Sequence, residues 1–229
     1  MSSEIEVKRT EKKYSISVLV AAKLKAALSL GLKNDPYNSG DGYLVRSLYF
    51  DTIYNDDYED KISGLESRRK IRLRTYNPKA ETLKLELKEK HGQSQLKRSL
   101  IISKQTAQRL IQGEYSCLKE YVSKLAQEFF YIMQRELYRP KCVVEYSRLA
   151  YIVRENNIRV NIDRDIKVTE ASYDIFSQNL NLYPISRLIV LEVKYNHFLL
   201  DYVKDMINMA DKTEMAISKY CMARQISYL

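Results

Sequence analysis

The sequence predicts an α+β fold in which one antiparallel sheet of about eight strands carries helices on its apolar face. Three observations support this prediction. Short stretches rich in β-forming residues alternate apolar and charged side chains, turn-forming pairs separate them, and stretches with helical spacing lie between and after them. The chain of 229 residues is long enough to bury a core and has no internal repeat or low-complexity linker, so we expect a single domain over residues 1–229.

The first half of the chain is expected to begin with a strand and a helix. The residues before Tyr14 alternate loosely, and the stretch SVLVAAKLKAALSLGL then has helical spacing that ends near Gly31. The turn-forming stretch NDPYNSGDG leads into a strand and a short polar helix. Turns at Asn77-Pro78 and His91-Gly92 separate three further antiparallel strands. The strands after the turn-forming stretch are expected at residues 43–51, 68–76, 82–90 and 93–103, and the short helix at residues 54–63.

The second half is expected to contain two helices, a hairpin, one more strand and a helical tail. Leucine and aromatic side chains recur every three or four residues after position 116, and Glu155-Asn156-Asn157 separates two β-rich stretches. The predicted helices cover residues 104–112, 116–134 and 199–225, and the predicted strands cover residues 141–153, 158–169 and 187–195.

The composition is that of a globular protein with an excess of positive charge. Hydrophobic residues make up 45% and charged residues 29%, and the net charge of +9 favours polyanions as partners. Cys117, Cys142 and Cys221 are too far apart to suggest a zinc site or disulfide framework, so we expect reduced core thiols. No stretch resembles a signal peptide or reaches the length of a membrane span, and we expect a cytoplasmic location.

The charges of the predicted sheet are sorted by strand parity, because successive side chains of a strand point to opposite faces. In RRKIRLRTY, Arg72 and Arg74 share a face with Arg68 and Lys70, while Ile71 and the other apolar residues occupy the opposite face. The same separation recurs in the stretches TLKLELKEK, RVNID and RLIVLEVKY. One face of the sheet is therefore expected to be charged and the other apolar.

A charged face has an ordinary interpretation, which is exposure to water. Between Arg68 and Ile102, however, eleven lysines and arginines accompany three glutamates, and neighbouring like charges on one face repel each other. An anion bound to this face would explain the imbalance. A sheet of about eight strands can curl into a barrel whose charged face lines a channel, and guanidinium groups suit phosphate oxygens. Glu11, Glu86 and Glu192 share this face, where they could pair with cations or hold a divalent metal.

Several stretches together resemble the VTC-type polyphosphate polymerase domain of the CYTH, or triphosphate tunnel metalloenzyme, superfamily. They are RTEKKY, VRSLYFDT, RKIRLRTY, LELKEK, VEYSRLAY, RVNID, LEVKY and SKYC. The superfamily motif ExExK fits two registers, EIEVK at residues 4–8 and the triad Arg9, Glu11 and Lys13, of which we prefer the second. The resemblance implies an eight-stranded antiparallel barrel that forms a triphosphate tunnel, with helices packed outside and a C-terminal helix near its wall.

The resemblance also implies roles for residues at matching positions. Mn²⁺ or Mg²⁺ is the implied cofactor. Strand parity selects Lys97 over Arg98. The implied catalytic residues are Arg72, Arg74, Lys88 and Lys219. The implied phosphate-binding residues are Arg9, Lys13, Arg46, Lys70, Lys97, Arg148, Arg159, Lys194 and Ser218. The implied metal ligand is Glu192, with Glu11 and Glu86 as further candidates.

The activity implied by the resemblance is transfer of the γ-phosphoryl group of ATP to a phosphate or polyphosphate chain. Arg9 stands where hydrolytic relatives carry an acid, and one carboxylate fewer favours transfer over hydrolysis. Two alternatives stay open: a tripolyphosphatase or nucleoside triphosphatase in the same tunnel, and a noncatalytic module that binds polyphosphate or nucleic acid. The expected partners are ATP, triphosphate and polyphosphate, with room for a membrane-bound protein. Nucleic acid is disfavoured because the cations show no regular aromatic stacking partner in the sequence.

Overall fold

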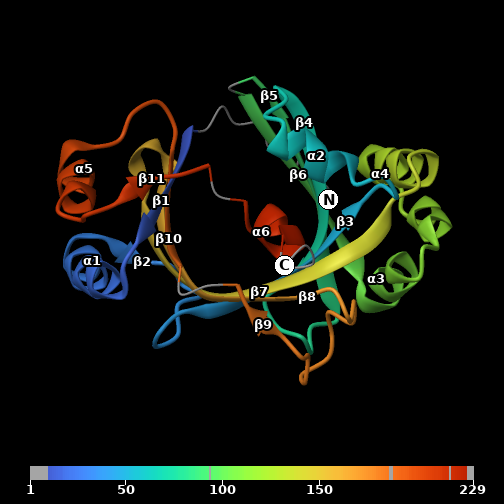
Figure 1. The fold of residues 1–229 in the computed structure, drawn as a ribbon, viewed down its shortest axis with the longest axis horizontal. Coiled ribbons are helices and arrows are strands. Elements are labelled where there is room, and N and C mark those ends of the chain that lie inside the picture. The colour runs from blue at the N-terminus through green and yellow to red at the C-terminus, as the bar shows by residue number, and fades with distance from the viewer. Residues whose placement is uncertain (1–9, 93, 186–187, 217, 226–229) are drawn as a thin grey trace.

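The computed structural model describes residues 10–92, 94–185, 188–216 and 218–225, and it consists of one curved sheet with helices on both sides (Figure 1). The strands are β1 (Thr10–Ile16), β2 (Lys33–Asn34), β3 (Tyr43–Asp51), β4 (Ser67–Thr75), β5 (Thr82–His91), β6 (Ser94–Ser103), β7 (Arg139–Val153), β8 (Ile158–Thr169), β9 (Tyr183–Pro184), β10 (Ile189–Tyr195) and β11 (Thr213–Glu214). The α-helices are α1 (Val18–Gly31), α2 (Asp56–Ile62), α3 (Lys104–Ile111), α4 (Lys124–Arg135), α5 (Asp201–Asn208) and α6 (Lys219–Gln225). Two short 3₁₀ helices are η1 (Tyr115–Glu120) and η2 (Glu155–Asn157).

The sheet contains eight long strands and three strands of two residues among the described residues, and its order is β11-β1-β10-β8-β7-β3-β4-β5-β6. All of its pairings are antiparallel. In Figure 1 the sheet curves around α6, so that the side containing β1 and β11 faces the side containing β5 and β6. No strand pairing in the described part of the chain joins these two margins. The tunnel-like curvature is confirmed, although the backbone pairings among the described residues do not close the sheet into a barrel.

The convex face of the sheet is apolar and carries two groups of helices, as the strand parity predicts. Helices α1 and α5 cover β1, β8 and β10, where Leu28 packs with Val160 and Leu191. Helices α3 and α4 with η1 cover β4, β5 and β6, where Phe129 packs with Leu85 in a second cluster. Gly31 lets α1 approach α5 closely, because a Cβ there would lie 2.0 Å from Met206 Cε. Helix packing therefore directs the opposite, charged side chains of these strands toward the concave face.

Helix α6 lies inside the curve of the sheet rather than outside it (Figure 1). Tyr220 and Cys221 pack there against apolar side chains that include Val45, Val144 and Val190. This cluster covers part of the concave face and leaves the charged part open. The three cysteines are buried and free, as expected.

Two sequence predictions about helices are wrong. The helix predicted at residues 116–134 is divided into η1 and α4, because Tyr121 is extended and the Ser123 side chain caps a new helix by accepting a hydrogen bond from Ala126 N. The helical tail predicted at residues 199–225 is interrupted by β11, which pairs with Tyr14 and Ser15 of β1. No helix in the described ranges has the length and apolar character required to cross a membrane.

Candidate functional site

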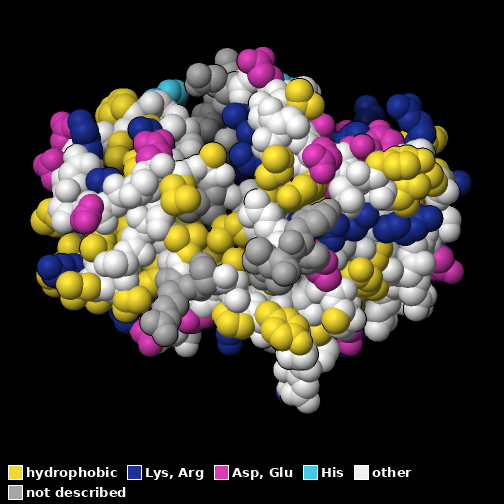
Figure 2. All heavy atoms as spheres, in the orientation of Figure 1, with side chains coloured by type: hydrophobic (Ala, Val, Ile, Leu, Met, Phe, Trp, Pro, Cys, Tyr) yellow, Lys and Arg dark blue, Asp and Glu magenta, His cyan; other side chains and the backbone are white. Residues whose placement is uncertain are grey.

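A cavity of about 400 Å³ lies between the concave face of the sheet and the segment that leads into α6. Twelve lysine or arginine side chains and four glutamate side chains line it. Figure 2 shows Lys and Arg side chains in the recess between the two sides of the molecule. The carboxylates of Glu86 and Asp163 contact lining cations from behind, which still leaves an excess of six formal positive charges. The cavity is therefore suited to a ligand with several negative charges.

One wall of the cavity is formed by β4, β5 and β6, and its cations surround Glu86. The carboxylate of this residue, which is only 1% exposed, lies 2.7 Å from Arg72 Nε and 3.8 Å from Arg74 Nη1. Lys97 Nζ approaches its other oxygen at 2.5 Å. Burial raises the pKa of Glu86, but Arg72, Arg74 and Lys97 outweigh this effect and hold the pKa well below its usual range. Glu86 is thus an anion that orients three cations.

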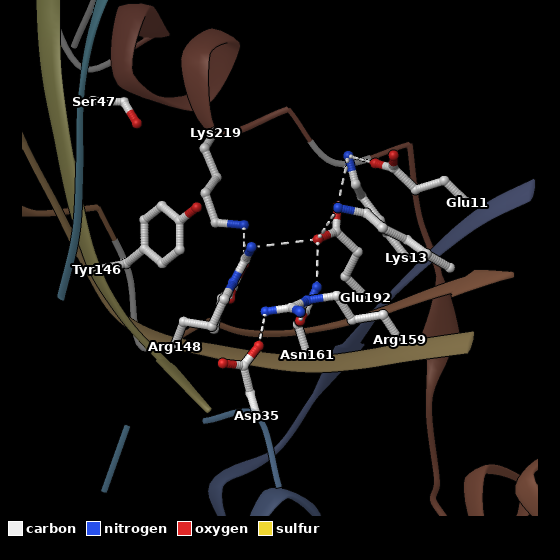
Figure 3. A network of polar contacts seen from close by, with 12 residues as sticks. Glu11, Lys13, Asp35, Ser47, Tyr146, Arg148, Arg159, Asn161, Glu192 and Lys219 are labelled. Carbon is white, nitrogen blue, oxygen red and sulfur yellow. Dashed lines mark hydrogen bonds and ion pairs between the residues drawn. The ribbon is translucent and has the colours of Figure 1, made fainter. Parts of the chain in front are cut away.

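The opposite wall contains Glu192 on β10, which is the centre of a second network (Figure 3). Its Oε2 atom accepts hydrogen bonds from Arg148 at 3.3 Å and from Asn161 at 3.1 Å, and Lys194 Nζ lies 2.9 Å away. Its Oε1 atom lies 3.8 Å from Lys13 Nζ. Burial raises the pKa of Glu192, yet these lysines and the arginine keep it well below its usual value.

Lys219, the first residue of α6, and Ser218, which directly precedes this helix, line the cavity. Lys219 Nζ lies 2.6 Å from Asp163 Oδ2, and Arg148 makes a two-pronged contact with the same carboxylate at 2.7 and 2.8 Å. Ser218 Oγ accepts a hydrogen bond from Lys70 at 2.7 Å. The position of α6 inside the sheet therefore determines where these groups meet the cavity.

Glu11 and Lys88 connect the two sides of the cavity. Lys88 Nζ of β5 lies 2.9 Å from Glu11 Oε2 of β1, and Lys13 lies 2.8 Å from the other oxygen of Glu11. Burial and Glu192 raise the pKa of Glu11, whereas the neighbouring lysines lower it more strongly, to about 2. Burial lowers the pKa of Lys88 to about 8, so this ammonium group is held less firmly in its charged form than an ordinary lysine.

The carboxylates differ in their fit to a divalent metal. Glu11 and Glu192 both contact Lys13, so a divalent cation that displaces this ammonium group would have oxygen donors from two strands. Mg²⁺ is commonly held by one or two carboxylates together with substrate phosphates. Glu86 fits poorly because three cations already surround it. The described residues contain no cluster of three or more metal-ligating side chains.

Most of the candidate residues from the sequence line this cavity. Glu86, Lys97 and Arg159 are not among its lining residues but belong to the polar networks around Glu86 and Glu192. Arg46 points to the other face of β3, where Glu145 and the backbone oxygens of Ile175 and Ser177 bind its guanidinium group, so its expected contact with phosphate is wrong. Arg9 lies outside the described residues. Strand parity also explains Lys97 and Arg98, because Lys97 lies on the face of Glu86, which it contacts, while Arg98 points away from this face and binds Glu89 and Glu128. The cavity itself includes Lys13, Lys70, Arg72, Arg74, Lys88, Arg148, Lys194, Ser218 and Lys219.

The strand parity of RVNID places Asp163 on the charged face with Asn161, but the sequence interpretation assigned it no role in the site. The sequence interpretation also missed the aromatic partners of the cations. Tyr146 lies under two cations, with Lys219 Nζ at 4.7 Å and the Arg148 guanidinium at 5.3 Å from the ring centroid. Tyr49 lies 5.8 Å from the Arg72 guanidinium. Because both rings are buried, they position cations and are not available for stacking with nucleobases.

Two solved structures share this arrangement of strands around a cavity. The first is described as an adenylyl cyclase candidate from Hippeastrum with a dominant triphosphatase activity; the identity is 15%, the TM-score 0.58 and the coverage 94% of both chains. The second is described as an adenylate cyclase candidate from Bacillus halodurans, with 15% identity, a TM-score of 0.52 and coverage of 90% of this chain and 87% of the other. At this level of identity both likenesses concern the fold alone.

The family to which the chain belongs follows from its sequence. A family model described as the VTC domain matches residues 8–228, so the chain belongs to the VTC domain family. A search among curated proteins gives no match.

Proposed function

We propose that this domain transfers the γ-phosphoryl group of ATP to the end of a phosphate or polyphosphate chain in the basic cavity. The observation that carries the proposal is the combination of twelve lining cations with few carboxylates in a partly enclosed space. ATP and polyphosphate both carry several negative charges, and such a space concentrates and orients them. The VTC domain match and the fold of the relatives support the same class of substrate.

The reaction requires positioning and charge neutralisation more than covalent participation of the protein. An oxygen of the acceptor phosphate attacks the γ-phosphorus, the bond from this phosphorus to the β–γ bridging oxygen breaks, and ADP leaves. Arg72 and Arg74 present guanidinium groups on one wall of the cavity, where they would neutralise the oxygens of the transferring group. Lys88 of β5 and Lys219 of α6 also line the cavity, where they would neutralise the charge on the leaving and accepting phosphates.

The proposal includes dependence on Mn²⁺ or Mg²⁺, held by Glu192 with Glu11. The ion would neutralise and orient phosphate oxygens when bound. Lys13 contacts both carboxylates, so this lysine would be released toward the phosphates when the ion takes its place. Glu86 is assigned to the orientation of Arg72 and Arg74 and not to the metal.

A single assay separates transfer from hydrolysis. The purified protein is incubated with radiolabelled ATP and Mn²⁺ or Mg²⁺, and ADP, orthophosphate and acid-insoluble polyphosphate are quantified together. We expect ADP to form in step with phosphate incorporated into polymer. Release of orthophosphate equal to ADP, without chain growth, would assign a triphosphatase and contradict transfer. The triphosphatase activity named for the Hippeastrum protein is the observation that favours this alternative.

The same purified protein also distinguishes a noncatalytic binding module from an enzyme. If neither ATP nor tripolyphosphate is turned over with either metal, yet long polyphosphate binds in calorimetry, the domain is a binding module and the catalytic proposal fails.

A further inference from the structure

We propose that three tyrosines at one end of the concave face bind the base of a nucleoside triphosphate whose phosphates extend into the cavity. Tyr37, Tyr43 and Tyr76 form this group, which we call the aromatic mouth. The proposal rests on the proposed function and adds to it a means of distinguishing a nucleotide from inorganic triphosphate.

The aromatic mouth is a connected set of rings from three separate segments. The ring centroids of Tyr43 and Tyr76 lie 5.9 Å apart, and those of Tyr37 and Tyr43 lie 6.4 Å apart, both in edge-to-face arrangements. Tyr43 begins β3, Tyr76 follows the end of β4, and Tyr37 belongs to the turn before β3. The side chain of Tyr43 thus sits between two other rings, an arrangement that holds all three in place.

Exposure separates this group from the tyrosines inside the cavity. Tyr37 is 78% exposed and Tyr76 is 44% exposed, whereas Tyr49, Tyr146 and Tyr220 are buried. A packing role accounts for the buried rings, but it does not account for large apolar surfaces left open beside a charged cavity. Aromatic rings of this kind are suitable surfaces for stacking with a base, because every base has a π face.

A chain of hydrogen bonds connects the aromatic mouth with the catalytic centre. Arg159 donates to Tyr43 Oη at 2.9 Å and to Asn161 Oδ1 at 3.1 Å, and Asn161 in turn donates to Glu192 at 3.1 Å. Figure 3 shows a dashed line from the Arg159 guanidinium group to Asp35, and the same group contacts Asn161. The guanidinium group of Arg159 therefore lies between the rings and the proposed metal ligand.

The spacing is suitable for a nucleoside triphosphate with its base outward. Tyr43 is the strand partner of Arg148, and Tyr76 follows Arg74 by two residues, which corresponds to roughly 6.7 Å along a strand. Lys84 lies over the Tyr76 ring at 5.6 Å. Lys84 therefore places positive charge beside the rings, where the α-phosphate of a nucleotide would lie, and Arg159, which also pairs with Asp35, offers N–H donors there. Arg74 and Arg148 line the cavity itself. Inorganic tripolyphosphate would use the deeper cations alone.

The test compares the binding of ATP with that of inorganic tripolyphosphate by calorimetry, for the wild type and for variants of the aromatic mouth. The double variant Tyr37→Ala/Tyr76→Ala should bind ATP about tenfold more weakly, because stacking contributes on the order of 1 to 3 kcal/mol per base. Its affinity for tripolyphosphate should change less than about twofold. Tyr37→Phe/Tyr76→Phe keeps the rings and should bind both ligands like the wild type.

The control is Tyr131→Ala on α4, an exposed tyrosine that does not line the cavity. An equal loss of affinity for ATP and tripolyphosphate in the double alanine variant would show that the rings only support the fold. Unchanged ATP affinity would show that the rings do not contact the base. Either result overturns the inference. If the selective loss occurs but no polyphosphate forms, the aromatic mouth stands and phosphoryl transfer fails. If wild-type protein binds neither ligand, the proposed function and this inference fail together.

Discussion

Replacement of Glu86 by glutamine should destabilise the ligand-free protein and make its stability more dependent on phosphate. The carboxylate is buried and contacts Arg72, Arg74 and Lys97 at 2.7, 3.8 and 2.5 Å. Glutamine has nearly the same shape, so the variant creates no cavity and removes only the charge. Three cations then share a confined space without the carboxylate that they surround in the wild type.

The size of this effect follows from the burial of the carboxylate. Removal of one partner from a buried ion pair costs about 3 to 5 kcal/mol. The Lys97 side chain is 47% exposed, so water screens part of its interaction with Glu86. We therefore expect a loss at the lower end of this range, about 3 kcal/mol. In a chain of 229 residues, each kcal/mol shifts Tm by about 2 to 4 °C, so the ligand-free Tm should fall by roughly 6 to 12 °C.

The assay is thermal unfolding with and without tripolyphosphate. A ligand at a hundred times its Kd raises the free energy of unfolding by about 2.7 kcal/mol, and in the variant its charge also compensates the unpaired cations. The difference in Tm between Glu86→Gln and wild type should therefore narrow when tripolyphosphate is present. Glu114→Gln, which removes an exposed partner of Arg109, serves as the matched control and should change stability by less than about 0.5 kcal/mol. A ligand-free Tm equal to that of the wild type would refute the assignment of Glu86 as the orienting charge.

Three further predictions concern catalysis, pH and the backbone. Arg72→Ala and Glu192→Ala should each lower ATP turnover by about a hundredfold or more while circular dichroism shows a folded protein, and wild-type turnover in either would mean that the charged face is only solvated. Burial lowers the pKa of Lys88 to about 8, so its positive charge is lost as the pH rises through this value. The affinity for tripolyphosphate measured by calorimetry should therefore weaken between about pH 7 and about pH 9. A Lys88→Met variant with the same pH profile would contradict this prediction. Gly42 has a φ of +118°, and a Cβ there would lie 2.3 Å from the Arg148 carbonyl oxygen. Gly42→Ala should therefore lower the free energy of unfolding, measured by chemical denaturation, by about 1 to 3 kcal/mol. An unchanged denaturation midpoint would show that the alanine causes no strain.

The faces of the sheet were predictable because each strand has one face buried under helices. Such burial fixes the parity of every side chain, and a shift by one residue would place Ile71 or Leu73 in the charged cavity. The same rule shows why the expectation for Arg46 was wrong. Leu48 and Phe50 share its parity and belong to the apolar convex cluster, whereas Ser47 and Tyr49 face inward. The alternation of apolar and polar side chains in the sequence of β3 was therefore sufficient to place Arg46 on the convex face.

The position of α6 and the gap in the sheet were not predictable in the same way. Local periodicity distinguishes a helix from a strand, but it does not state which side of a curved sheet a terminal helix will occupy. The contacts of Tyr220 with Asp51 and of Lys219 with Asp163 join residues that are far apart in the sequence. The aromatic mouth likewise depends on three segments that only the folded chain brings together.

The margins of the sheet, which no strand pairing joins in the part of the chain that the structure describes, affect how the width of the cavity is maintained. In a sealed barrel, the circumference is fixed by rows of backbone hydrogen bonds and can change only when these bonds break. Here the contact between Lys88 and Glu11, at 2.9 Å, reaches from one side to the other without a strand pairing. An ionic contact responds to salt and to the charge of whatever lies beside it. The width of the cavity at this contact therefore depends on the ionic conditions, and a polyanion that competes for Lys88 would alter it.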